Sequence, residues 1–227
     1  MCGRYTYLTS EELIHEFDLL PAQANQLNLL AVPDNYNAAP GMQMPVIIRG
    51  VQEHVPELMT WGLIPAWTRG KSQLKLINAR KEGLFEKSMW KRLVNTRRCI
   101  VPASGFYEWK KTPEGKIPYY ITPKDSKIFS FAGLWDEWTN DKGVMMKTYT
   151  IITAAPNQEM AAIHDRMPVI LSKNQAGIWM SPINLTEAQA EDVLQPAPDG
   201  TLRLQRVSTA VNSTRNNYKE LIYPLED

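Results

Sequence analysis

The sequence predicts a single α+β domain built on a mostly antiparallel, barrel-like β-sheet flanked by short helices. A chain of 227 residues, 44% hydrophobic and 22% charged, is the size of one globular domain with a sizeable core. Segments rich in β-branched and aromatic residues recur through most of the chain. Helix-like segments interrupt them irregularly, which favours an antiparallel sheet over strict β-α alternation. No repeat or linker-like stretch divides the chain, so we expect one domain over residues 1–227.

The first expected element is an amphipathic helix over residues 9–20, because Thr9 and Glu12 form a capping box before apolar residues at helical spacing. Strand-like runs, separated by Pro, Gly or Asp, then predict strands over 45–49, 98–101, 105–110, 117–122, 128–135, 145–153 and 168–171. Short helices are expected over 84–94, 157–162, 173–180 and 186–194. The remaining turn-rich stretch, 195–201, reads as a loop.

Composition and charge restrict the class of function. The formal net charge is +1, so any surface for nucleic acid must be a local patch. Cys2 and Cys99 are too few and too far apart for a disulfide framework or a zinc site. The sequence shows no signal peptide, membrane span, glycine-rich phosphate loop or metal-ligand cluster. We therefore expect a cytoplasmic protein that works without a metal or other cofactor.

The candidate nucleophile is Cys2, because a small residue at position 2 generally permits removal of Met1. Removal would expose a cysteine with a free α-amine. The amine, with a pKa of about 7.7–8.0, and the thiol, with a pKa of about 8.5, are both partly nucleophilic at neutral pH. An aldehyde is the natural electrophile for such a 1,2-aminothiol, since amine and thiol together close a thiazolidine ring on it. A cysteine at position 2 is by itself weak evidence for a catalytic role, so the surrounding sequence motifs decide whether Cys2 is the nucleophile.

That context is a series of motifs in a fixed order. They are MCGRY at the start, NAAPG (Asn37 to Gly41), WGLIPAW (Trp61 to Trp67), INAR (Ile77 to Arg80), GFYEW (Gly105 to Trp109) and HDRMPVIL (His164 to Leu171). In this order they resemble the SRAP family, the SOS response-associated peptidase-like proteins that process abasic sites. The resemblance extends to about residue 217, through SxxVNxxRN at Ser208 to Asn216.

The resemblance implies a reaction and its catalytic residues. In the family the processed N-terminal cysteine crosslinks to the ring-opened aldehyde of an abasic site in single-stranded DNA, which makes Cys2 the nucleophile here. Asn78, Glu108 and His164 fall on the family's catalytic positions. A partly buried carboxylate such as Glu108 suits the proton transfers of imine formation. His164 would act on the sugar oxygen and Asn78 would orient the sugar or the amine.

The same motifs supply candidate contacts to DNA. Arg4, Arg80 and Arg166 lie in or beside them, and a guanidinium suits bidentate binding of phosphate. Trp67 and the loop from Asn37 to Pro40 offer surfaces on which unpaired bases would stack or which would wedge a strand apart. The expected partner is single-stranded DNA containing abasic sites, bound by a monomer that associates with the nucleoid when it acts.

Other functions stay open from the residues alone. An N-terminal-nucleophile glutamine amidohydrolase also begins Met-Cys-Gly, but no Asn-Gly pair occurs in this chain to supply its oxyanion element. Peptidase activity is confined in our interpretation to removal of residue 1, and lyase cleavage of the strand is a further activity to consider. A non-covalent single-strand-binding module is the third alternative, and its DNA binding would be abolished by salt.

Most other chemistry-bearing side chains have structural interpretations. His15 and His54 are expected at the surface, and Cys99 as a small buried side chain. Four tryptophans are expected in the core, namely Trp90, Trp135, Trp138 and Trp179. The basic pairs Arg97/Arg98 and Lys110/Lys111 are interpreted as solvated strand ends, with phosphate contact as the alternative. Strand alternation alone would leave Glu108 facing solvent.

Overall fold

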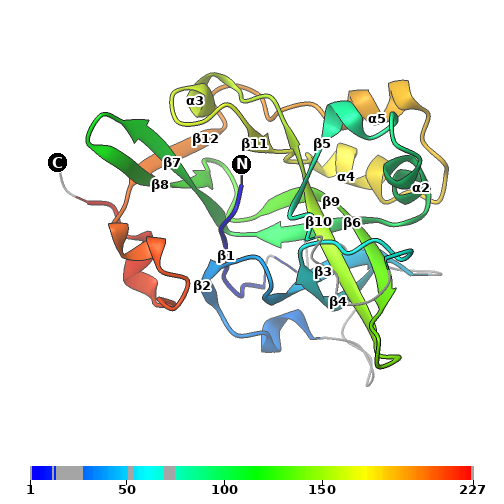
Figure 1. Cartoon of the computed structure of the whole chain (residues 1–227). Helices are drawn as coiled ribbons and strands as arrows, with labels where there is room; N and C mark the ends of the chain where they lie inside the picture. Colours follow the sequence, from blue (N-terminus) through cyan, green and yellow to red (C-terminus); the bar gives the residue numbers. More distant parts are fainter. Residues whose placement is uncertain (1, 12, 14–27, 51–53, 69–74, 226–227) are drawn as a thin grey trace.

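The computed structural model of the chain describes residues 2–11, 13, 28–50, 54–68 and 75–225. Its centre is a closed five-stranded β-barrel with the strand order β10-β4-β3-β6-β9, and pairing of β9 with β10 closes the ring (Figure 1). These strands are β3 (Gln43–Arg49), β4 (His54–Trp61), β6 (Arg98–Ala103), β9 (Phe129–Thr139) and β10 (Met145–Ala154). The β4–β10 pair is parallel and the other neighbours are antiparallel. The α+β, barrel-like fold class is confirmed.

A second, antiparallel sheet has the order β12-β8-β7-β1-β2. Its strands are β1 (Tyr5–Tyr7), β2 (Asn35–Ala38), β7 (Gly105–Thr112), β8 (Gly115–Pro123) and β12 (Leu202–Arg206). The β7–β8 hairpin extends away from the barrel (Figure 1). At its base a Cβ atom on Gly105 would lie 2.5 Å from the ring of Tyr120, so this close approach requires glycine.

Short elements complete the fold. Two further strands, β5 (Asn78–Arg80) and β11 (Met167–Pro168), pair with β10. The helices are α2 (Ser88–Thr96), α3 (Gln158–Ala161), α4 (Lys173–Trp179) and α5 (Glu187–Val193). Single 3-10 turns are η1 (Leu29–Ala31), η2 (Lys81–Gly83), η3 (Thr209–Asn212) and η4 (Lys219–Ile222). Capping boxes start α4 at Ser172 and α5 at Thr186, which fixes the first turn of each helix.

The barrel interior is filled by aromatic side chains that connect the two sheets. Tyr5 of β1 lies 5.1 Å from Trp61, measured between ring centroids, and Trp61 stacks on Tyr149 at 6.3 Å. The hydroxyls of Tyr5 and Tyr149 share a hydrogen bond of 2.7 Å at the centre of this cluster. These contacts of Tyr5 therefore fix β1, and with it the residues just before this strand, to the barrel.

Most predicted elements are confirmed, with shifted ends. The strand expected over 168–171 is wrong in extent: β11 covers Met167–Pro168, and Ile170 forms one isolated bridge to Phe131. The helix expected over 84–94 begins later, at Ser88, after the η2 turn. Most of the helix expected over residues 9–20 lies outside the described residues, and so does His15.

Among the residues expected to be structural or at the surface, two differ from the expectation. Cys99 and the four tryptophans assigned to the core are buried. Arg98 is not a solvated strand end: it is 8% exposed and donates hydrogen bonds to backbone carbonyls that include those of Val94 and Ser181. Glu108 does not face solvent, since it is 3% exposed. No helix within the described residues is long and apolar enough to cross a membrane.

Candidate active site

Cys2 lies fully buried, three residues before β1. Its backbone carbonyl accepts a hydrogen bond of 2.9 Å from Nδ2 of Asn78, and its Sγ lies 3.9 Å from the carbonyl of Arg4. Burial raises the pKa of the Cys2 thiol far above its ordinary value, and the negative charge of Glu108 raises it further. The thiol is therefore neutral near pH 7 in this structure, and Glu108 is close enough to act on it electrostatically.

Asn78 is positioned by the barrel. It is the first residue of β5, where it pairs in parallel with Ile151 of β10, and the preceding carbonyl of Ile77 accepts a hydrogen bond from the Trp61 indole at 2.9 Å. Its Oδ1 is buried without a hydrogen-bond partner among the described residues. The amide therefore fixes the Cys2 backbone through its nitrogen and keeps an acceptor on its oxygen.

Glu108 reaches the site from the middle of β7, opposite Tyr119 of β8. Its Oε2 accepts a hydrogen bond of 3.3 Å from the backbone N–H of Trp109. A nearly buried carboxylate beside a thiol is suited to moving a proton, because few waters compete for it. Strand alternation missed this burial because β7 is buried on both faces over its first four residues.

His164 follows α3 and reaches the same site with a fixed ring orientation. Its Nδ1 accepts the backbone N–H of Arg166 at 3.0 Å and lies 2.8 Å from the carboxylate of Asp165. An amide N–H can only donate, so the first contact makes Nδ1 an acceptor and leaves the proton on Nε2. The Asp165 side chain is 84% exposed, so water screens its contact with the imidazole.

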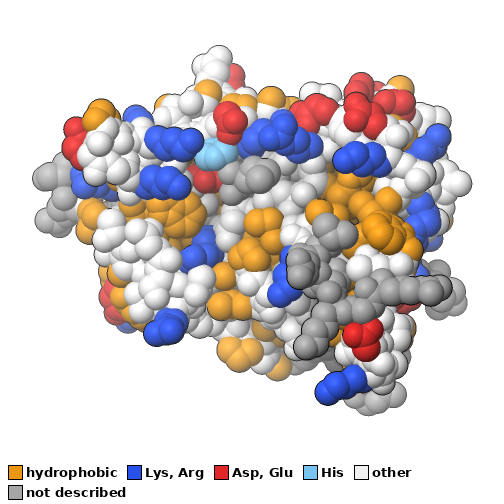
Figure 2. All heavy atoms as spheres, in the orientation of Figure 1, with side chains coloured by type: hydrophobic (Ala, Val, Ile, Leu, Met, Phe, Trp, Pro, Cys, Tyr) orange, Lys and Arg blue, Asp and Glu red, His pale blue; other side chains and the backbone are white. Residues whose placement is uncertain are grey.

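Glu108 and His164 line one pocket of about 370 Å³. The other residues of its wall, which the sequence did not single out as a group, are Trp109, Lys111, Lys116 and Asn212. The Trp109 indole donates to Oδ1 of Asn212 at 2.7 Å, which joins the C-terminal segment to β7. Figure 2 shows Lys and Arg side chains on both sides of a histidine on this face. The pocket is therefore a small polar site in a basic surrounding.

Three of the residues expected to contact DNA make internal contacts: Asn37 and Arg166 are buried, and Arg4 is half-buried. Arg4 donates to Oδ1 of Asn37 and to the carbonyl of Val211, both at 2.8 Å. Asn37 is 1% exposed and donates to the carbonyls of Ser213 and Asn216. Together, Arg4 and Asn37 hold the C-terminal segment against β1 and β2.

Arg166 is the third such residue. It is 9% exposed and pairs with both carboxylate oxygens of Glu82, at 2.9 and 3.0 Å. This pairing lowers the pKa of Glu82. A phosphate would have to compete with Glu82 for the same guanidinium. Arg80 and Pro40, by contrast, are exposed and available at the surface.

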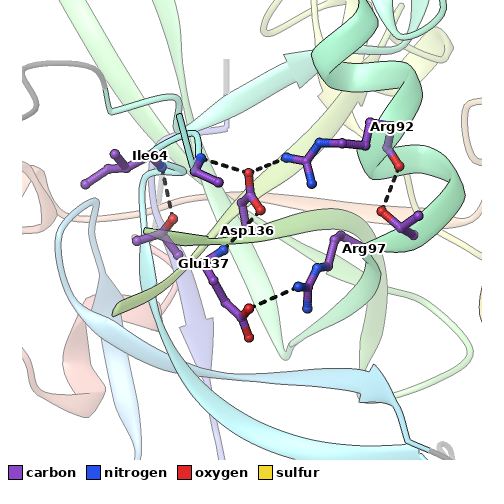
Figure 3. A network of polar contacts seen from close by, with 8 residues as sticks. Ile64, Arg92, Arg97, Asp136 and Glu137 are labelled. Carbon is purple, nitrogen blue, oxygen red and sulfur yellow. Dashed lines mark hydrogen bonds and ion pairs between the residues drawn. The ribbon is translucent and has the colours of Figure 1, made fainter. Parts of the chain in front are cut away.

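Trp67 is 65% exposed, in the loop that follows β4. The loop is fixed by buried polar groups on β9 and β10, shown in Figure 3. Oδ2 of Asp136 accepts the backbone N–H of Ala66 at 3.0 Å and a guanidinium N–H of Arg92 at 2.6 Å. The Trp138 indole donates to the carbonyl of Thr68 at 2.7 Å. Hydrogen bonds to Ala66 and Thr68 therefore hold the backbone on either side of the exposed Trp67.

Comparison with known proteins identifies the family. The family model "SOS response associated peptidase (SRAP)" matches residues 1–214. The chain belongs to the SRAP family. It is 40% identical to abasic site processing protein YoqW of Bacillus subtilis, over 98% of this chain and 99% of that protein. It is 33% identical to abasic site processing protein HMCES of Gallus gallus, over 85% of this chain and 66% of that protein.

A solved structure supports the same fold. A crystal structure of a protein from Bacteroides thetaiotaomicron superposes with a TM-score of 0.86 at 26% identity, covering 99% of this chain and all of that one. The resemblance expected from the sequence motifs is confirmed at the level of family and fold.

Proposed function

We propose that this SRAP protein captures abasic sites in single-stranded DNA by forming a thiazolidine with Cys2 after Met1 is removed. The observation that carries the proposal is that Glu108 lies close enough to the Cys2 thiol to raise its pKa while lining one pocket with His164. The relatives are named abasic site processing proteins, which points to the same lesion.

The reaction balances with one water released. The Cys2 α-amine adds to the aldehyde carbon of the ring-opened sugar, and the carbinolamine loses water to give an imine. The S–H of Cys2 then adds across the C=N bond, so that sulfur binds carbon and the proton ends on the ring nitrogen. Burial keeps the resting Cys2 thiol protonated, so Glu108 accepts the S–H proton as sulfur attacks the imine carbon and passes it to the ring nitrogen.

The other two residues act by position. Nε2–H of His164 donates to the sugar oxygen and favours the open aldehyde, while Asn78 holds the Cys2 backbone and its Oδ1 accepts a hydrogen bond from the amine. The imine is also the intermediate from which β-elimination cleaves the strand, so ring closure and lyase cleavage compete. Removal of Met1 by the protein itself belongs to the same proposal.

The surface for the strand joins exposed and internal residues. Arg80, Pro40 and Trp67 contact the strand directly, with Trp67 stacking on an unpaired base. Arg4, Asn37 and Arg166 shape the surface from behind, and Arg166 reaches phosphate when it exchanges Glu82 for it. The partner is single-stranded DNA with an abasic site, bound by a monomer.

The test is a crosslinking assay with protein whose free N-terminal Cys2 has been verified by mass spectrometry. A single-stranded oligonucleotide with one abasic site should give a band on a denaturing gel, at the summed mass less one water. Cys2→Ala and an intact-base strand serve as controls and should give none. Absence of the band from verified protein would overturn the proposal. Glutaminase activity would then support the amidohydrolase alternative. Strand binding that is abolished by salt would support the non-covalent binding module.

A further inference from the structure

The tip of the β7–β8 hairpin carries two lysines in an unfavourable arrangement. Lys111 and Lys116 are directly opposite each other in the antiparallel register. Both are exposed, and neither forms an ion pair with an acidic side chain within the described residues. Like charges at opposed positions of a sheet destabilise it. The hairpin therefore keeps a repulsion that a bound anion would relieve.

The position of the two lysines indicates which anion they bind. Both lysines line the pocket that also contains Glu108 and His164. On the same wall, Asn212 has its Oδ1 engaged by the Trp109 indole, so its amide N–H groups are oriented by that bond. Lysine is also a common means of protecting sheet edges, but edge protection does not require the two ammonium groups to face a catalytic pocket.

We propose that Lys111 and Lys116 together bind the backbone phosphate next to the abasic nucleotide while its sugar lies between Glu108 and His164. This inference rests on the proposed function and adds a phosphate subsite to it. The two non-bridging oxygens of a phosphodiester offer one acceptor to each ammonium, and the flexible lysine stems allow both to reach. Binding releases counterions and removes the Lys–Lys repulsion.

The phosphate is held equally before and during the reaction, so the subsite should act on affinity rather than on the chemical step. In Lys111→Gln/Lys116→Gln, the strand concentration for half-maximal crosslinking rate should rise about tenfold at low salt, with the maximal rate unchanged. The slope of log affinity against log salt should fall by about 0.7 for the lost phosphate. Lys124→Gln/Lys142→Gln removes the same charge from other exposed positions and should change neither quantity.

Removing the charge of single DNA phosphates shows which of them the two lysines contact. A strand with methylphosphonate at the two linkages flanking the abasic site should bind wild-type protein about tenfold more weakly. The same replacement should cost the double variant little more, because the contact is already lost. If inorganic phosphate competes strongly while methylphosphonate has no effect, the pair binds free phosphate and the proposal is overturned.

One substitution separates binding from folding. Lys116→Glu converts the repulsion with Lys111 into attraction, so it should raise the melting temperature while still raising the half-maximal strand concentration. A double variant that behaves like the Lys124/Lys142 control would refute the subsite. If wild-type protein forms no crosslink, the proposed function fails instead, and affinity for an intact single strand still tests the lysine pair.

Discussion

The Asn78 side chain holds the backbone of Cys2, because its Nδ2 donates to the Cys2 carbonyl at 2.9 Å across 76 residues of sequence. Asn78 in turn is fixed by parallel pairing of β5 with β10. The barrel therefore holds the backbone of Cys2, the proposed nucleophile, through Asn78. This relationship assigns Asn78 a positioning role that involves no change of charge.

Asn78→Asp tests this role with little change in shape. The carboxylate cannot donate to the Cys2 carbonyl and would repel it, so the crosslinking rate at saturating strand should fall by roughly 10- to 100-fold. The free energy of unfolding should fall by about 1 kcal/mol for the lost hydrogen bond. Asn174→Asp, exposed in the first turn of α4, makes the same replacement away from the site; it should leave the rate unchanged and should not lower stability, because a negative charge is favourable at a helix N-terminus. An unchanged rate in Asn78→Asp would show that Cys2 is positioned by other contacts.

Stability should fall at alkaline pH because several buried groups are held neutral. Burial raises the pKa of the Cys2 thiol and of the Tyr5 and Tyr107 phenols above their ordinary values of 9.0 and 10.0, and that of Tyr120 to about 12. The unfolded chain releases these protons near the ordinary values while the folded chain keeps them. The stabilisation is therefore complete below pH 9 and is lost as pH rises.

Urea unfolding at about pH 8 and about pH 10.5 measures this loss. The free energy of unfolding should be lower at the higher pH. Tyr120→Phe removes one of the titrating groups, so the difference between the two pH values should shrink in this variant. A free energy that stays constant over this range would mean that the buried phenols are not held neutral by the fold.

Much of the fold followed from the sequence because long strands carry their own pattern. The aromatic and β-branched runs of β7, β9 and β10 predicted these strands with errors only at their ends. The short strands β1 and β5 have three residues each and gain their pairing from neighbours, so no local periodicity marks them. In β4, Pro56 and Glu57 interrupt the strand pattern although the strand is eight residues long.

The candidate site was predictable in its residues but not in its connections. Motif order pointed to Cys2 and Glu108, and the structure places them close enough to interact. The sequence could not show that Arg4 and Asn37 bind the C-terminal segment, because both side chains donate to the carbonyl of Val211, which is 207 and 174 residues away in the chain. Lys111 and Lys116 likewise become a pair only through the register of the hairpin.

The two arginines of the INAR and HDR motifs should behave differently. Arg80 is exposed, so Arg80→Gln should weaken strand binding at low salt with little effect on stability. The slope of log affinity against log salt concentration should fall by about 0.7. Arg166→Gln leaves Glu82 and the Thr153 carbonyl without their donor and should cost about 1.5–3 kcal/mol of folding free energy. Salt titrations of DNA affinity and urea unfolding of both variants check this. Equal effects of the two variants on both quantities would contradict the assignment.

Asp136 should control DNA binding through the loop that presents Trp67. Asp136→Asn weakens the hydrogen bonds to Ala66 and Arg92 and should lower the free energy of unfolding by about 1.5–3 kcal/mol. Glu137→Gln, in the half-exposed ion pair with Arg97, should lower it by less than about 1 kcal/mol.

Trp67→Ala should weaken strand affinity by about 1–3 kcal/mol and leave stability unchanged, because the side chain is exposed. If Asp136 acts through this tryptophan, Asp136→Asn should weaken affinity in the wild-type background but add nothing in Trp67→Ala. Fluorescence anisotropy with a labelled single strand measures all four affinities. Additive losses would show that Asp136 affects the strand by a route other than Trp67, and Trp67→Phe, which keeps a stacking ring, should recover most of the affinity lost in Trp67→Ala.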